Sequence, residues 1–185
     1  MARRTTNTMT QYRLIAAWGL SLLLVISGDV VQSASDTQQF QVHVPTRISI
    51  TAPTIDPIRG YPGSGSADLT FAPQTWRART NSRRGVIVQL ETITAFRHVT
   101  TPTSKRNAQL DLSVNRIFGP GIWTVNTATS TTNYAAGNEQ AKVQLTATGA
   151  GEANLLLTVT FMTGVPGTLQ EGNYTTTVVG TITEN

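Results

Sequence analysis

The sequence predicts an all-β fold, an antiparallel β-sandwich of about eight strands, and three observations support it. Apolar and polar residues alternate in several stretches, such as Leu155 to Phe161, with the period of two that a half-buried strand requires. Residues typical of turns separate these stretches at short intervals. No segment shows a helical period long enough to connect parallel strands. Together these features favour a sandwich of antiparallel sheets over any mixed α/β arrangement.

The first 34 residues have the features of a secretory signal peptide. Arg3, Arg4 and Arg13 are positively charged, and the uncharged apolar run Leu14–Ile26 is shorter than a comfortable membrane span. Small residues follow, which places the predicted cleavage site near Ala34. An uncleaved N-terminal anchor is the alternative interpretation. Residues 35–185 are then expected to form one sandwich domain, with an N-terminal strand in residues 35–51.

The expected mature chain is large enough for a hydrophobic core and is only weakly basic. Cleavage leaves about 150 residues, which is the size of one domain. It removes three of the 14 basic and one of the 10 acidic residues, so the formal net charge falls from +4 to +2. The chain contains no cysteine, so disulfides and thiol chemistry are excluded and stability depends on packing.

The pattern predicts that two long strands near the C-terminus form a closing hairpin. The first runs from Ala153 to Met162 and the second from Asn173 to Thr183, with a turn around Gly164, Pro166 and Gly167. Threonine is frequent in both, as expected for a residue whose branched Cβ suits a pleated strand.

Two other predicted hairpins follow from matching apolar faces. They join Thr75–Thr80 to Val86–Glu91 and Ala141–Thr148 to Ala153–Val159. In the first, Trp76 would face Leu90 on the inner side, while Arg77 and Arg79 point outward and Glu91 lies diagonal to Arg77. In the second, Leu145 would meet Leu155 and Val143 would meet Leu157.

The remaining segments are two strands and two loops. Strands are predicted at Ala108–Val114, with Leu110 and Leu112 inward, and at Ile122–Thr127. Adjacent apolar residues at the start of the second strand leave its inward residue undecided between Ile122 and Trp123. The Pro- and Gly-rich residues 53–66 and the segment Tyr134–Asn138 are predicted to be loops.

Phe40, Val42 and Val44 form a short alternating stretch at the expected mature N-terminus. Such a strand can complete the open sheet edge of a neighbouring subunit through main-chain hydrogen bonds, with its apolar side chains filling a groove. The alternative is that Phe40 to Ile50 is the first strand of its own sandwich, bent at Pro45, which cannot donate a ladder hydrogen bond. The sequence alone slightly favours the second interpretation.

No catalytic residues, metal ligands or cofactor-binding motif are predicted. The two histidines, His43 and His98, are far apart in sequence, and no His, Asp or Glu cluster has metal-ligand spacing. No glycine-rich segment has the strand-to-helix context of a phosphate-binding loop, and no serine lies in a nucleophile elbow.

A basic stretch is the main charged feature of the chain, and the residues predicted to form its basic surface are Arg77, Arg79, Arg83 and Arg84. An anionic polymer such as a polysaccharide would suit it, but Trp76 is predicted to face inward, away from the charges. A solvated face or a subunit contact is therefore favoured. Nucleic acid is the least expected partner of a secreted chain with so small a net charge.

Two segments carry a family resemblance. The Phe40-x-Val42-x-Val44 strand, and the closing Leu169–Tyr174 segment that leads into the last threonine-rich strand, resemble small secreted fimbrial subunits and spore-coat-U-like surface proteins of bacteria. The likeness covers residues 36–185 at the level of layout, and this chain lacks the cysteine pair of many such subunits. It implies an immunoglobulin-like sandwich, export to the periplasm or cell surface, and assembly by strand donation.

Two hypotheses from different classes follow. The first is a non-enzymatic structural protein of the bacterial surface, a filament or coat subunit that associates with itself through Phe40, Val42 and Val44. The second is a secreted carbohydrate-binding or adhesive module that uses loops 53–66 and 115–121, with Tyr61, Trp123 or Tyr134 stacking on a surface polysaccharide. An enzyme is a distant third.

Overall fold

The strands of the described residues follow the alternating sequence pattern closely. The structure is a computed structural model that describes residues 37–63, 67–165 and 167–185, so the predicted signal peptide lies outside the described residues. Residues 37–42 and 43–185 form separate units and are described separately. The strands of the second unit are β1 Ile48–Thr51, β2 Leu69–Thr70, β3 Gln74–Thr80, β4 Val86–Thr92, β5 Phe96–His98, β6 Lys105–Arg106, β7 Ala108–Phe118, β8 Trp123–Thr127, β9 Thr129–Thr131, β10 Lys142–Ala147, β11 Gly151–Phe161, β12 Tyr174–Thr175 and β13 Val178–Glu184.

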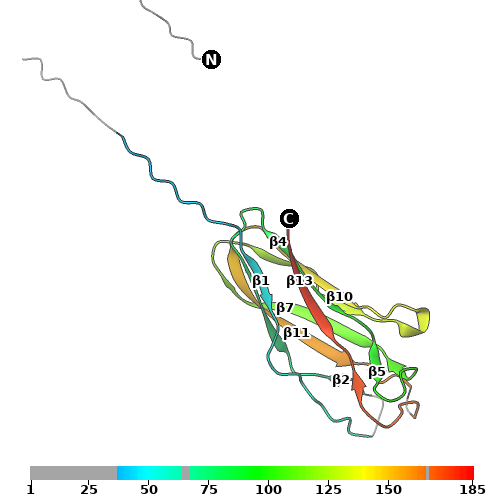
Figure 1. Cartoon of the computed structure of the whole chain (residues 1–185). Helices are drawn as coiled ribbons and strands as arrows, with labels where there is room; N and C mark the ends of the chain where they lie inside the picture. The colour runs from blue at the N-terminus through cyan, green and yellow to red at the C-terminus, as the bar shows by residue number, and fades with distance from the viewer. Residues whose placement is uncertain (1–36, 64–66, 166) are drawn as a thin grey trace, which may run out of the picture. The chain divides into compact units, whose positions relative to one another are not determined.

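These strands form two main sheets and one small sheet, and all of their pairings are antiparallel. The first sheet has the order β1-β3-β11-β7-β9, with β2 also paired to β11, and the second has the order β13-β4-β10-β8. The small sheet is β12-β5-β6. Figure 1 shows the strands of the two main sheets running along the length of the second unit. The predicted all-β sandwich is confirmed, and it contains several more short strands than the eight predicted.

The core lies between the two main sheets and is built from the inward residues of each. Trp76 and Ala78 of β3 and Val86, Val88 and Leu90 of β4 are buried, and the residues between them are more exposed. β11 lies in the middle of the first sheet, and its inner residues, such as Leu155 and Leu157, are buried in the same core. The predicted inner faces of these strands are therefore correct.

The predicted pairing partners are wrong in all three hairpins. β3 belongs to the first sheet and β4 to the second, and β10 and β11 are likewise in different sheets. The closing pair is also split, because β11 pairs with β3, β7 and β2 while β13 pairs with β4. Each connection crosses from one sheet to the other, so the apolar faces meet across the core instead of side by side.

The turn from β3 to β4 shows why this crossing is tight. Gly85 has a φ of 84°, and a Cβ there would lie 1.9 Å from the carbonyl oxygen of Ala147. Only glycine fits so close to the backbone of β10 in this left-handed conformation.

The predicted diagonal contact of Glu91 with Arg77 is absent. Glu91 instead lies opposite Lys142 on β10.

The other predicted segments agree with the structure in most respects. The predicted strand Ala108–Val114 is the first part of β7, and Leu110 and Leu112 are buried. In β8 the inward residue is Trp123, while Ile122 precedes the strand and is exposed. The predicted loop at Tyr134–Asn138 contains the short 3-10 turn η1, Tyr134–Ala136, which ends at Gly137 in the left-handed conformation. Among the described residues, no helix is long and apolar enough to cross a membrane.

One side of the sandwich is closed by a strand that changes sheets. β8 pairs with β10 in the second sheet, and after the single residue Ala128 the chain continues as β9, which pairs with β7 in the first sheet. The amide of Leu112 donates to the carbonyl of Ala128 at 2.7 Å, which holds this crossing in place. Strands that switch sheets in this way form the corners of β-sandwiches.

Candidate functional site: the open side of the sandwich

The opposite side of the sandwich has two strand edges that lie near each other without pairing. In the described part of the chain β1 pairs only with β3, and β13 pairs only with β4. β1 and β13 are nevertheless close in space. Roughly every second residue of an edge strand directs its N–H and C=O away from its partner, so the seven-residue β13 offers several main-chain groups for pairing.

The contact between these edges is tightest at Gly180 in the middle of β13. A Cβ at this position would lie 2.6 Å from Cζ3 of Trp76 and 2.8 Å from Cδ1 of Ile50. Ile50 lies on β1 and packs against the main core. The absence of a side chain at Gly180 thus lets β1 and β13 approach, and the side chains between them cover the core on this side.

The strand order matches most of an immunoglobulin-type sandwich. In that fold the first sheet has strands A, B, E and D, and the second has C, F and G, with G paired to the outer edge of F. Here β1, β3, β11 and β7 have the places of A, B, E and D, while β4 and β13 have those of C and F. In the described structure no strand occupies the place of G beside β13.

The predicted N-terminal strand is not part of any described sheet. Residues 37–47 have no strand assignment, and the first strand of the sandwich begins only at Ile48. The side chains of Phe40, Val42 and Val44 are 83%, 85% and 72% exposed. The interpretation in which Phe40 to Ile50 is the first strand of its own sandwich is therefore correct only from Ile48 onward, because only Ile48–Thr51 pairs with β3.

Asn81 fixes the chain immediately before β1. Its Nδ2 donates to the carbonyl of Pro45 at 2.9 Å, and its Oδ1 accepts from the amide of Arg47 at 2.5 Å. Its own amide donates to the carbonyl of Arg47 at 3.1 Å. These bonds extend the β1–β3 ladder by one residue and tie residues 45–47 to the β3 side of β1, which is the side away from β13.

The predicted basic surface is divided between paired and unpaired residues. Arg77 and Arg79 lie on the outer face of β3, as predicted, and both form ion pairs with Glu152 of β11. The hydrogen bond from Arg77, with that from Arg79, lowers the pKa of the Glu152 carboxyl below its usual value. Arg83 and Arg84 are exposed in the β3–β4 turn and have no ion pair within the described residues.

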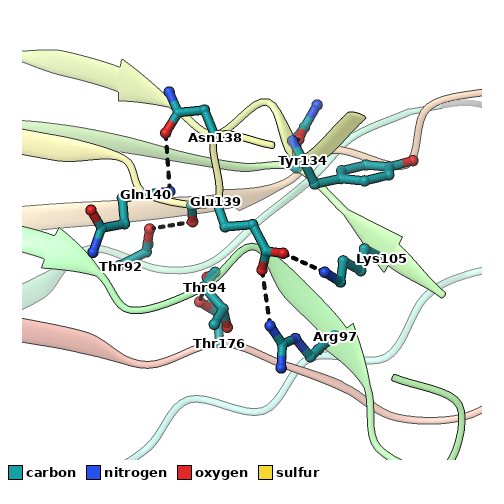
Figure 2. A network of polar contacts seen from close by, with 10 residues as sticks. Thr92, Thr94, Arg97, Lys105, Tyr134, Asn138, Glu139, Gln140 and Thr176 are labelled. Carbon is teal, nitrogen blue, oxygen red and sulfur yellow. Dashed lines mark hydrogen bonds and ion pairs between the residues drawn. The ribbon is translucent and has the colours of Figure 1, made fainter. Parts of the chain in front are cut away.

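A second charged group holds the loop after η1 against the small sheet (Figure 2). The Glu139 carboxylate accepts from Arg97 of β5 at 3.0 Å and also pairs with Lys105 of β6. The hydrogen bond from Lys105, followed by that from Arg97, lowers the pKa of Glu139. Thr92 adds two bonds to this segment, since its Oγ1 accepts from the amide of Ala141 at 2.9 Å and donates to the carbonyl of Glu139 at 3.4 Å.

The aromatic residues of the carbohydrate-binding hypothesis lie in different environments. Trp123 is only 6% exposed and belongs to the main core, so its ring faces offer no surface for stacking. Tyr61 is partly exposed in the loop before β2. Tyr134 is partly exposed in η1, and Figure 2 shows its ring directed away from the Glu139 carboxylate. Sequence periodicity could not show whether Trp123 faces the core, because Ile122 beside it is equally apolar.

The two histidines do not meet in one site. His98 on β5 is buried, and its Nε2 lies 2.8 Å from the carbonyl oxygen of Glu171 while its Nδ1 accepts from the amide of Thr101 at 3.0 Å. His43 is exposed before β1. Within residues 37–63, 67–165 and 167–185, no group of three or more His, Asp and Glu side chains has the arrangement of a metal site.

The comparisons with known proteins add no family to this geometry. No protein-family model and no curated protein sequence matches the chain.

Proposed function

We propose that the protein is a non-enzymatic structural subunit of the bacterial cell surface that assembles with further copies of itself by β-strand addition. The strand that is added is Phe40–Val44, and the edge that receives it is the outer edge of β13. The chain then forms a filament or coat because each copy carries both a donor segment and an acceptor edge.

The observation that carries this proposal is the unfilled place beside β13. β13 has the position of strand F, and the sandwich is closed on its other side by β8 and β9 but not here. Unpaired edge strands are templates for pairing with another chain, and proteins usually protect them. β13 is not protected in this way, because its seven residues include only one charge, Glu184 at its end.

The N-terminal segment has the composition that such a place requires. Phe40, Val42 and Val44 are spaced by two, so in a strand all three side chains lie on one face. Burying one side chain of this kind contributes roughly 1.5–3 kcal/mol, so the three together offer about 5–9 kcal/mol before the cost of association. Main-chain hydrogen bonds to β13 add to this.

The position of the Asn81 contacts favours donation to another copy over insertion into the same sandwich. To reach β13 of its own chain, the segment would have to reverse direction within Pro45–Arg47 and cross to the other side of β1. The hydrogen bonds of Asn81 with Pro45 and Arg47 oppose this reversal. Donation in trans requires no change at these residues.

The test uses the mature chain and a variant that lacks residues 36–44. We expect the full chain to form polymers visible by electron microscopy and light scattering, and the deletion variant to stay monomeric with nearly the same β-sheet circular dichroism spectrum. A synthetic peptide of residues 36–47 should bind the deletion variant with one-to-one stoichiometry and raise its melting temperature.

A matched pair of point substitutions separates the donor strand from general surface hydrophobicity. Val42→Asp should abolish polymerisation, whereas Ile58→Asp should leave it unchanged, since Ile58 is 97% exposed in the loop before β2. A full-length mature chain that stays monomeric at every concentration, or a Val42→Asp variant that polymerises like Ile58→Asp, would contradict the proposal.

A further inference from the structure

A cavity at the end of the sandwich where the small sheet lies combines a buried cation with several polar groups. It has a volume of about 390 Å³, within the range of small-molecule sites. Loops far apart in sequence form its wall, and the residues that matter here are Asp68, Arg106, Asn107, Tyr134, Met162 and Thr168. All of them lie in the second unit, so the cavity involves neither Phe40 nor Val42.

Arg106 is the unusual member of this wall because its charge is buried without a counterion. The residue is 8% exposed. Its Nε donates to the carbonyl of Thr163 at 3.0 Å, its Nη1 to the carbonyl of Lys105 at 2.7 Å, and its Nη2 to the Oγ1 of Thr168 at 3.0 Å and to the carbonyl of Thr168. All of these acceptors are uncharged, and no carboxylate of the described residues forms an ion pair with it.

Such a guanidinium favours an anionic ligand. Burying a charge costs free energy unless an opposite charge compensates it. A guanidinium has five N–H donors, and the bonds to Thr163, Lys105 and Thr168 use four of them, which leaves one on Nη1. A ligand carboxylate is a suitable partner for this remaining N–H, because its negative charge strengthens the hydrogen bond and compensates the charge of the guanidinium.

Asp68 lines the same cavity but does not neutralise Arg106. Its Oδ1 accepts from the amide of Thr163 at 2.9 Å and from the Oγ1 of Thr163 at 3.3 Å. Arg106 binds the carbonyl of the same threonine, and no ion pair joins Asp68 to Arg106 among the described residues. No hydrogen bond to Oδ2 of Asp68 is present in the described structure, which leaves this oxygen available as an acceptor for a hydroxyl group.

Asn107 and Tyr134 complete the polar lining. The Oδ1 of Asn107 accepts from the amide of Tyr134 at 3.0 Å and from the Oγ1 of Thr132 at 3.1 Å, which fixes both residues. Within the described part of the chain, neither the Nδ2 of Asn107 nor the hydroxyl of Tyr134 makes a hydrogen bond. The Tyr134 ring and the Met162 side chain supply apolar surface beside these groups.

We infer that this cavity binds an acidic sugar, a uronic acid unit of a polysaccharide. The carboxylate of the sugar pairs with Arg106, its hydroxyls bond to Asp68 and Asn107, and its ring lies against Tyr134. A neutral sugar would leave the charge of Arg106 uncompensated. A simple carboxylic acid without hydroxyl groups would leave Oδ2 of Asp68 and Nδ2 of Asn107 without a partner. This site is separate from the β13 edge, so the inference does not depend on assembly by strand addition.

The test measures binding of tetragalacturonate to the mature chain by isothermal titration calorimetry. We expect saturable binding that weakens at least tenfold when the carboxylates of the probe are methyl-esterified. Tyr134→Ala should weaken binding at least fivefold. Asn107→Asp should do the same, because it keeps the oxygen that holds Tyr134 but replaces the amide donor with a negative charge.

Two control variants and a folding measurement make the result decisive. Arg83→Gln removes an exposed positive charge outside the cavity, and Tyr61→Ala removes an aromatic ring in another loop, so both should bind like the original chain. Melting temperatures show that Tyr134→Ala and Asn107→Asp remain folded. The inference is wrong if tetragalacturonate does not bind at millimolar concentration or binds as well when esterified. It is equally wrong if Tyr134→Ala has no effect, or if Arg83→Gln weakens binding as much as the cavity variants do.

Discussion

Replacing Gly180 with alanine tests how closely β1 and β13 approach on the open side of the sandwich. The added Cβ would lie 2.6 Å from Cζ3 of Trp76, 2.8 Å from Cδ1 of Ile50 and 3.0 Å from Cδ2 of Leu90. Ile50 and Leu90 can move the ends of flexible side chains. The Trp76 ring is rigid and only 8% exposed, so it can relieve the overlap only by shifting within the core.

The expected cost is the balance of two opposing effects. Overpacking of a core by one methyl group costs about 1–3 kcal/mol. Replacing glycine with alanine also restricts the unfolded chain, which stabilises the fold by about 0.4–1 kcal/mol when the backbone conformation suits both residues. Gly180 does not have the positive φ that would prevent this gain. The net loss in the free energy of unfolding is about 1–2 kcal/mol, or roughly 2–8 °C in melting temperature for a domain of this size.

Urea and thermal unfolding of the original chain and of Gly180→Ala measure this loss in stability. Gly60→Ala is the matched control. Nothing lies within 4 Å of a Cβ at Gly60, and its φ is not positive, so the same substitution there should leave stability unchanged or slightly raised. Trp76→Phe should make Gly180→Ala less costly by removing part of the obstructing ring. A Gly180→Ala variant as stable as the Gly60→Ala variant would refute the close approach of the two edges.

Two further predictions concern polar contacts. Asn81→Ala removes two side-chain hydrogen bonds to residues 45–47, each with a net value of about 0.5–1.5 kcal/mol, so hydrogen exchange at Arg47 should accelerate about fivefold or more. Asn173→Ala, at an exposed asparagine, is the control, and equal exchange at Arg47 in both variants would contradict the role of Asn81. The second prediction concerns Glu139, whose pKa is lower in the folded chain than its ordinary value of 4.5. Its contribution to stability is therefore present above about pH 4.5 and disappears as the pH falls through the folded pKa. Glu139→Gln should be less stable than the original chain at pH 6, and urea midpoints should converge in acid; a difference that persists unchanged at pH 2 would show that the charge is not the cause.

The comparison of sequence and structure is most informative at the β3–β4 connection. The alternation of Trp76 and Ala78 with Arg77 and Arg79 correctly assigned the inner and outer faces, because side chains in any strand alternate with a period of two. The same alternation cannot distinguish a hairpin within one sheet from a connection that crosses between sheets. In both cases Trp76 and Leu90 lie on the core side. The incorrect pairing of β3 with β4 in one sheet therefore satisfied the pattern equally well.

The candidate sites show the same division. The alternation of Phe40, Val42 and Val44 was evident in the sequence, but the edge beside β13 depends on the order of strands in two sheets. The cavity at Arg106 has no local signal, since Asp68, Asn107 and Tyr134 are separated by up to 66 positions in the chain. Neither the unpaired edge of β13 nor the cavity could have been found from spacing.

The sequence by itself determined the β class, the inward residues of most strands, the turns and the absence of thiol chemistry, because these depend on local composition and on the two-residue period of a strand. Only the tertiary structure decided which strands pair, which side of the sandwich is open and which polar residues share a cavity. The reason is that pairing is chosen by the fit of both sheets around one core, which involves residues distant in sequence.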